Sequence, residues 1–150
     1  MFENVTISND VKFDDIHAFY NQRIPDHHPE YYWDARLSSK SVLMAYDNQK
    51  PCGFLVINLI WGNLPFIELL KVKEDHQHIG IGTKLLEAAT KTVKNWGFEN
   101  ILSSSETENE SGLAFHNKCG FKKLNSHSMS LFWVWGQMVI LLPCSLVRSN

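Results

Sequence analysis

The sequence lacks most of the features that would set it apart from ordinary globular proteins. Its three cysteines, Cys52, Cys119 and Cys144, are an odd number without C-x-x-C spacing, which favours reduced thiols and a cytoplasmic location over a disulfide framework. The 14 basic residues form no dense run and the net charge is −2. We therefore expect no nucleic-acid partner.

Long hydrophobic runs are also missing. The apolar run Leu131–Trp135 is short and is followed by Gly136-Gln137, whereas a membrane-spanning helix needs about 20 apolar residues. The N-terminus shows no basic, apolar and small-residue succession, so we expect no signal peptide and no membrane partner. The chain has no internal repeat and is 150 residues long, the size of one domain, so we predict a single domain over residues 1–150.

A closed set of metal ligands is not evident either. His27, His28 and Glu30 lie in a loop that contains two prolines, but the further ligands that a metal site requires are missing. The sequence therefore predicts no metal. We expect residues 24–34 to form a substrate-facing loop, because loops carry recognition residues. Ordinary packing of Tyr32 and Trp33 is the alternative.

The order of apolar periods and turn signals predicts an alternating succession of strands and helices. Residues 41–46 and 51–60, which flank a polar tetrapeptide, are expected to form an antiparallel pair. The other expected strands are 5–7, 66–72, 100–105, 121–128 and 137–142, and the expected helices contain Ile16 to Tyr20, Trp33 to Leu37, Leu85 to Trp96 and Leu113 to Lys118. The run 131–135 is interpreted as a core strand or, alternatively, as a subunit interface or lid.

The chain is organised around the stretch from Ile67 to Trp96. An apolar strand leads through a turn into a helix whose apolar residues recur on one face, and Gly97 stands where a helix ends. The residues of that face are Leu85, Leu86, Ala89, Val93 and Trp96. A strand, a helix and a further strand in succession imply a right-handed parallel crossover.

The turn before this helix predicts an anion site. A helix start leaves backbone N–H groups without partners and carries partial positive charge. Gly80 and Gly82 allow close approach of a phosphate, and Thr83 adds a hydroxyl. A dinucleotide fingerprint is excluded because Leu85 stands at the third glycine position, and a P-loop is excluded because the order is Gly82-Thr83-Lys84.

Two motifs in this order resemble one family. Val72, four residues and then Gln77-His78-Ile79-Gly80-Ile81-Gly82 resemble the acyl-CoA signature Gln/Arg-x-x-Gly-x-Gly/Ala of the GNAT superfamily of N-acetyltransferases. The second motif, Asn109-x-x-Gly112-x-x-Phe115-His116-x-x-x-Gly120-Phe121, resembles a later GNAT motif with glycine for alanine and histidine for tyrosine. The resemblance covers roughly residues 41–124.

The resemblance implies an α/β (α+β) fold. We expect a single GNAT-like domain with a mixed central sheet of about six or seven strands, about four flanking helices, and splayed parallel strands at the coenzyme site. It also implies acetyl-CoA as cosubstrate, with the pyrophosphate on the glycine turn and the pantetheine arm along the preceding strand. The residues expected to bind it are Leu70, Lys71, Val72, Gln77, His78, Ile79, Gly80, Ile81, Gly82, Thr83, Asn109 and Phe115.

The implied activity is transfer of the acetyl group to a primary amine of a small molecule or peptide, directly in a ternary complex. Glu68 is the expected base, with a solvent-facing or lysine-paired carboxylate as the alternative. His116 is the expected proton donor to the leaving thiolate, with a packing or capping histidine as the alternative. Other readings are a catalytically weak acyl-CoA sensor and a purely structural domain. Family members often form homodimers.

Overall fold

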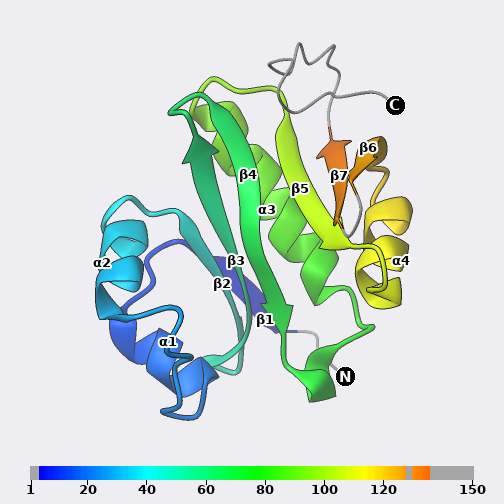
Figure 1. The fold of residues 1–150 in the computed structure, drawn as a ribbon. Helices are drawn as coiled ribbons and strands as arrows, with labels where there is room; N and C mark the ends of the chain where they lie inside the picture. The colour runs from blue at the N-terminus through cyan, green and yellow to red at the C-terminus, as the bar shows by residue number, and fades with distance from the viewer. Residues whose placement is uncertain (1–3, 128–129, 136–150) are drawn as a thin grey trace.

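The computed structural model describes residues 4–127 and 130–135. Over these residues the chain forms one seven-stranded sheet in the order β1-β2-β3-β4-β5-β7-β6 (Figure 1). The predicted mixed sheet is confirmed. The strands are β1 (Val5–Ser8), β2 (Val42–Asp47), β3 (Lys50–Ile60), β4 (Leu64–Val72), β5 (Ile101–Glu106), β6 (Lys122–His127) and β7 (Ser130–Trp135).

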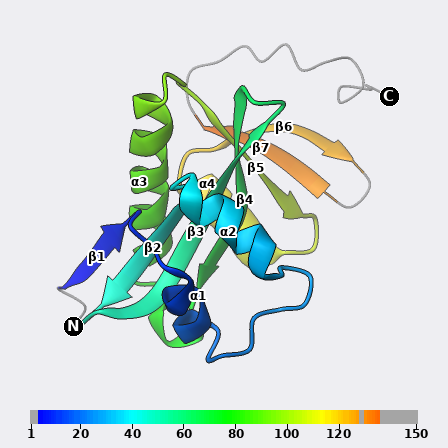
Figure 2. The same ribbon diagram turned by 90° about the vertical axis from the view of Figure 1, so that its left-hand side faces the viewer.

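Helices cover both faces of the sheet, so each face has its own core (Figure 2). On one face α1 (Phe13–Phe19) and α2 (Glu30–Ser38) pack on the central strands around the fully buried Trp33 and Phe54. On the other face lies α3 (Ile81–Asn95), with α4 (Glu110–Lys118) beside it. A short 3-10 turn, η1 (Glu74–His76), follows β4. In the described part of the chain no helix is long and apolar enough to cross a membrane.

Helix α3 has the predicted apolar face with one exception. Leu85, Leu86, Ala89 and Val93 are buried against the sheet, and Gly97 follows in the left-handed conformation expected after a helix, with φ 92°. Trp96, which the periodicity placed on the same face, is 37% exposed. That part of the prediction is wrong: Trp96 is the C-cap and follows the last helical residue, Asn95.

The parallel pairing of β4 and β5 is confirmed, and it is very short. A single register pair, Phe66 with Leu102, joins them near their N-terminal ends. Beyond it the two strands separate, as the diverging arrows of Figure 2 show. The predicted splay is therefore present, and it opens a gap in the middle of the sheet.

The last strands differ from the prediction in their position. The apolar run 131–135 is part of β7, which lies between β5 and β6 and pairs antiparallel with both. The core-strand interpretation is confirmed, because a strand between two others has no free edge, and Trp133 is buried. Residues 137–142, which the sequence offered as the final strand, lie outside the described residues.

Candidate active site

A cleft of about 600 Å³ occupies the gap between β4 and β5 and extends to the start of α3. One wall is the C-terminal half of β4, and the other is formed by β5 and α4. The turn between β4 and α3 closes one end. The cleft thus joins the strand gap to the glycine turn, the two features that the sequence analysis singled out.

Most of the predicted site residues meet in this cleft. Those that line it are Glu68, Leu70, Val72, Gln77, His78, Gly80, Ile81, Gly82, Thr83, Asn109, Phe115 and His116. Lys71 and Ile79 are not part of its lining. Side chains alternate along a strand, so Lys71 points to the opposite face, where its Nζ lies 5.5 Å from the ring centre of Tyr20. Ile79 is 41% exposed at the tip of the turn.

The start of α3 fits an anionic group. Gly80 is the N-cap, with φ 91°, and it supplies no side-chain cap to the helix. No acidic residue stands in the first turn of α3. A Cβ at Gly80 would meet no atom within 4 Å, so the space in front of these N–H groups is open. His78, with φ 61°, is also left-handed, and such turns gather backbone N–H groups into an anion-binding concavity.

The second glycine of the turn has a packing role beside the predicted approach of a phosphate. A Cβ on Gly82 would lie 3.1 Å from Cε2 of Phe115, so the absence of a side chain lets α4 approach α3. Gln77 also has a structural role, because its Nε2 donates to the carbonyl oxygen of Val72 at 3.0 Å. That bond ties the turn back to the end of β4.

Asn109 caps α4. Its Oδ1 accepts from the backbone N–H of Gly112 at 2.9 Å, which leaves the Nδ2 group for the predicted contact with a substrate. A Cβ on Gly112 would lie only 2.9 Å from that Nδ2 atom. A methyl group at position 112 would therefore press on the capping amide, which would have to shift.

His116 is buried in the wall of the cleft, at 5% exposure. Its Nδ1 lies 2.6 Å from the carbonyl oxygen of Gly112, and since a carbonyl can only accept, Nδ1 carries the hydrogen. The neutral ring then accepts at Nε2 from Ser103 Oγ, at 2.8 Å. Burial lowers the pKa of His116 below its usual 6.5, which favours the neutral form.

Trp133 holds this histidine in place. The two rings stack, with centroids 4.9 Å apart and planes 13° apart. The indole Nε1 donates to Ser105 Oγ at 2.9 Å. The apolar C-terminal strand therefore contributes to the site through Trp133.

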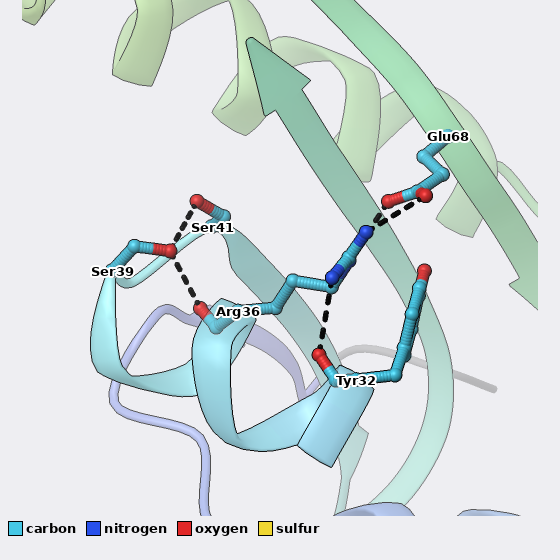
Figure 3. Close-up of polar contacts among 5 residues, drawn as sticks. All are labelled: Tyr32, Arg36, Ser39, Ser41 and Glu68. Carbon is cyan, nitrogen blue, oxygen red and sulfur yellow. Dashed lines mark hydrogen bonds and ion pairs between the residues drawn. The ribbon is translucent and has the colours of Figure 1, made fainter. Parts of the chain in front are cut away.

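Glu68 stands on a β-bulge. Val56 pairs with Leu69 and Ile57 with Ile67, so Glu68 is the extra residue of β4, and its side chain turns toward α2. Both carboxylate oxygens bind Arg36, at 2.8 Å to Nε and 2.9 Å to Nη2 (Figure 3). The structure thus pairs Glu68 with an arginine instead of exposing it or pairing it with a lysine.

Tyr32 completes this group. The guanidinium of Arg36 lies 3.6 Å from the centre of the Tyr32 ring. Figure 3 shows the Tyr32 hydroxyl on the side of Glu68, but it does not reach hydrogen-bonding geometry and is buried without a partner. Burial, and then the negative charge of Glu68, raise the pKa of Tyr32.

Sequence reasoning missed several residues of the site. Ser103, Ser104 and Ser105 line the cleft from β5, and Arg36 fixes Glu68. The serines carried a signal, because a strand of a parallel pair is normally apolar and three hydroxyls in succession depart from that pattern. No local pattern pointed to Arg36, which lies 32 residues from Glu68.

Comparison with known proteins gives the family. The model of the acetyltransferase (GNAT) family matches residues 9–121. The N-alpha-acetyltransferase 30 of Schizosaccharomyces pombe is 32% identical over 37% of this chain and 37% of its own, so the match spans little more than a third of that relative. The N-alpha-acetyltransferase of Saccharolobus solfataricus is 26% identical over 67% of this chain and 69% of its own.

Solved structures share the fold. Arabidopsis thaliana Naa50, in complex with the bisubstrate analogue CoA-Ac-MVNAL, superposes with a TM-score of 0.71 at 17% identity, over 89% of this chain and 99% of that one. At this identity the likeness shows the fold alone. The family match covers most of the chain, with both motifs at one cleft. This protein therefore belongs to the acetyltransferase (GNAT) family of acyltransferases.

Proposed function

We propose that this protein is an N-acetyltransferase that moves the acetyl group of acetyl-CoA to a primary amine, and that its acceptor is the α-amino group of a peptide. The observation that carries the proposal is the cleft, which joins the uncapped start of α3 to the gap between β4 and β5. A coenzyme with an anionic head and an extended arm needs both features in one groove.

The chain offers a place for each part of the coenzyme. The N–H groups at the start of α3, together with the Thr83 hydroxyl, would hold the pyrophosphate. The edge of β4 from Leu70 to Val72 is unpaired on the β5 side, so its backbone groups, including those of Lys71, would bind the pantetheine arm as an added strand does. The bound thioester supplies the acetyl group, and holding it near the amine accelerates the transfer.

The proton chemistry of the cleft favours an α-amine over a lysine side chain. A lysine amine with a pKa of about 10.4 is neutral in only about one molecule in 2,500 at pH 7, whereas an α-amine with a pKa of about 7.8 is neutral in roughly one in seven. Glu68 is the only carboxylate among the described cleft residues, and both of its oxygens bind Arg36. Among the described residues of this site, no carboxylate is free of a protein partner to act as a base. The site therefore suits an α-amine, of which a larger fraction is already neutral at pH 7. Both relatives above are named as N-alpha-acetyltransferases.

Glu68 and Arg36 then belong to the acceptor side of the cleft. The carboxylate presents negative charge to an incoming amine, and the unpartnered Tyr32 hydroxyl lies beside it. Glu68 would act as a base, directly or through water, only after Arg36 releases one of its oxygens. We therefore assign Glu68 first to positioning the amine and second to accepting the proton that an ammonium group must lose before it attacks.

Two peptides of the same sequence test the proposal. Both contain one lysine, and one has an acetylated N-terminus. With acetyl-CoA, the free peptide should release thiol and gain one acetyl group at its N-terminus by mass spectrometry, while the blocked peptide should stay unchanged. If the blocked peptide reacts equally well, the acceptor is the lysine side chain. If neither peptide raises thiol release above background, transfer to peptides is contradicted.

One observation favours a second function. Both candidate proton-transfer groups are engaged within the protein, Glu68 with Arg36 and His116 with Ser103. A module that binds acetyl-CoA as a signal and transfers little would have such a site. Calorimetry would then show tight binding of acetyl-CoA, while a panel of amines released no thiol.

A further inference from the structure

Ser103 and His116 form a buried hydrogen-bonded pair that faces the cleft. Ser103 lies on β5 at 4% exposure, and both residues line the cleft wall. Because the Gly112 carbonyl fixes the hydrogen on Nδ1 of His116, the hydroxyl of Ser103 must donate to Nε2, at 2.8 Å. The serine oxygen keeps lone pairs that can accept a proton from a group in the cleft.

The resting pair is therefore arranged to receive a proton and not to give one. The groups packed on the imidazole are Ser103, the Gly112 carbonyl, Phe115, Phe121 and Trp133. None of them carries a charge. A neutral histidine with its only hydrogen on Nδ1 cannot protonate a leaving thiolate through Nε2, so the predicted role of His116 as the initial acid does not follow from this geometry.

We infer that Ser103 and His116 form a proton relay that first takes a proton from the attacking amine and then returns it to the leaving sulfur. This inference rests on the proposed acetyl transfer. It assigns Ser103 as a catalytic residue that the sequence analysis did not find. His116 becomes the group that stores the proton between the two steps.

The relay balances in atoms and charge. The neutral amine forms a bond to the acetyl carbon, and the carbonyl π electrons move to oxygen. A proton leaves the nitrogen for Ser103 Oγ while the serine proton moves to His116 Nε2. The carbonyl then re-forms, the carbon–sulfur bond breaks with its electrons going to sulfur, and the Nε2 proton returns through Ser103 to the thiolate. The products are the amide and the free thiol, and the pair is restored.

One hydroxyl can serve both transfers because nitrogen and sulfur are bonded to the same carbon in the adduct. The surroundings of His116 favour the second step, since a buried imidazolium without a carboxylate beside it gives up its proton readily. The alternative is a structural role in which the serine only satisfies a buried histidine. The two roles differ in what happens when each partner is removed.

Steady-state kinetics separate the two roles. We expect Ser103→Ala and His116→Ala each to lower kcat by about 100-fold, with the double variant no worse than either single variant, because they act as one unit. Ser103→Thr keeps the hydroxyl and should restore most of the activity. Thr90→Ala, which removes a hydroxyl of similar burial that bonds only to the Glu87 carbonyl in α3, is the matched control and should match the wild type.

Two further readouts separate the relay from a structural role, and the first of them needs neither acetyl-CoA nor a variant. Nitrogen-15 spectra of the histidine rings of the free protein should show His116 with hydrogen on Nδ1 and none on Nε2 at pH 7. A protonated Nε2 in that spectrum would overturn the relay. Added imidazole should raise kcat of His116→Ala, which loss of packing would not allow.

The outcomes also distinguish this inference from the proposed function. If the wild type transfers acetyl groups and Ser103→Ala keeps its kcat and pH profile, the relay is wrong and the transferase stands. If the wild type binds acetyl-CoA but releases no thiol with any amine, the proposed function fails and the relay fails with it. Loss of kcat in Ser103→Ala that Ser103→Thr does not reverse would also overturn the relay.

Discussion

Two sides of the molecule, the α4–β5 wall of the cleft and the layer of α1 and α2 on the opposite face of the sheet, differ in how completely their buried polar groups are hydrogen-bonded. On the side of α4 and β5, His116, Ser103 and the Trp133 indole all have partners within the protein. On the side of α1 and α2, four buried atoms of the described residues have none, namely the hydroxyls of Tyr20 and Tyr32 and Nδ1 of His17 and His28. The buried polar groups around His116 are bonded within the protein, whereas those of the α1–α2 side keep unused hydrogen-bonding capacity.

This difference suggests a division of labour. Buried polar atoms without partners carry a desolvation cost of about 1–3 kcal/mol each, which a substrate or ordered water relieves on binding. On the bonded side, hydrogen bonds orient His116 and Ser103, which suits chemistry. The unbonded side is suited to recognising an acceptor that supplies the missing partners.

Removing Trp133 should have the largest effect, because it dismantles the bonded side. Trp133→Ala should cost about 3–5 kcal/mol in the free energy of unfolding, and it also leaves Ser105 without its donor and His116 without its stacking partner. Trp96→Ala, at a residue 37% exposed, is the control and should cost far less. Urea unfolding measures both, and equal losses would contradict the described packing of β7.

A charge at the glycine turn should abolish coenzyme binding and leave both sides of the molecule folded. Acetyl-CoA at 100 times its dissociation constant should stabilise the wild type by about 2.7 kcal/mol, and Gly80→Glu should lose that gain. Gly97→Glu is a matched control, because the two glycines have φ 91° and 92° and open space around a Cβ. Thermal unfolding with and without acetyl-CoA checks this. If acetyl-CoA stabilises both variants equally, the start of α3 is not the phosphate-binding site.

Lowering the pH should reduce the free energy of unfolding, because His116 on the bonded side becomes protonated. Since burial lowers its pKa in the folded state below 6.5, the unfolded chain binds the proton more tightly, and stability is lost as the pH falls below about 6.5. His28 shifts in the same direction and His76 in the opposite one, so the test compares the wild type with His116→Gln. Urea titrations from pH 8 to pH 5 should show a shallower loss in the variant. Parallel curves would mean that His116 is not the group responsible.

The smallest effect on stability is expected at Tyr32. Tyr32→Phe removes a hydroxyl that has no partner, so the free energy of unfolding should stay within about 0.5 kcal/mol of the wild type or rise. The KM for the acceptor should rise several-fold, while the KM for acetyl-CoA should not change. Tyr31→Phe, at the exposed neighbouring tyrosine, is the control. A clear loss of stability in Tyr32→Phe would mean that the Tyr32 hydroxyl does have a partner, and it would contradict the difference between the two sides.

The parts of the molecule that follow from local pattern were predicted from the sequence. The α3 periodicity, the left-handed Gly97 and the glycine turn are each set by a few neighbouring residues. The gap between β4 and β5 came from the family resemblance. These features place the cleft in the fold without knowledge of tertiary contacts.

The sequence named Glu68 and His116 but not their hydrogen-bond partners, because those contacts join residues that are distant in the chain. One extra residue at the β4 bulge turns Glu68 toward Arg36, and the alternation of side chains gives no sign of it. His116 was found through its motif, but its partner Ser103 lies 13 residues away on another element. The sequence indicated that residues 131–135 form an apolar core strand. It did not predict that this strand lies between β5 and β6.

The single register pair between β4 and β5 also makes the sheet two mechanical units. Strands β1 to β4 form one half of the sheet and β5 to β7 form the other half. In the described residues, Phe66 and Leu102 are the only register pair between the two halves, which we call the two plates. A bound molecule that forms hydrogen bonds with the facing edges of β4 and β5 would link the two halves and make the sheet more rigid there. Amide hydrogen exchange at the facing edges of the two plates should then slow on binding. The rigidity of the whole sheet would depend on its substrate as much as on its own chain.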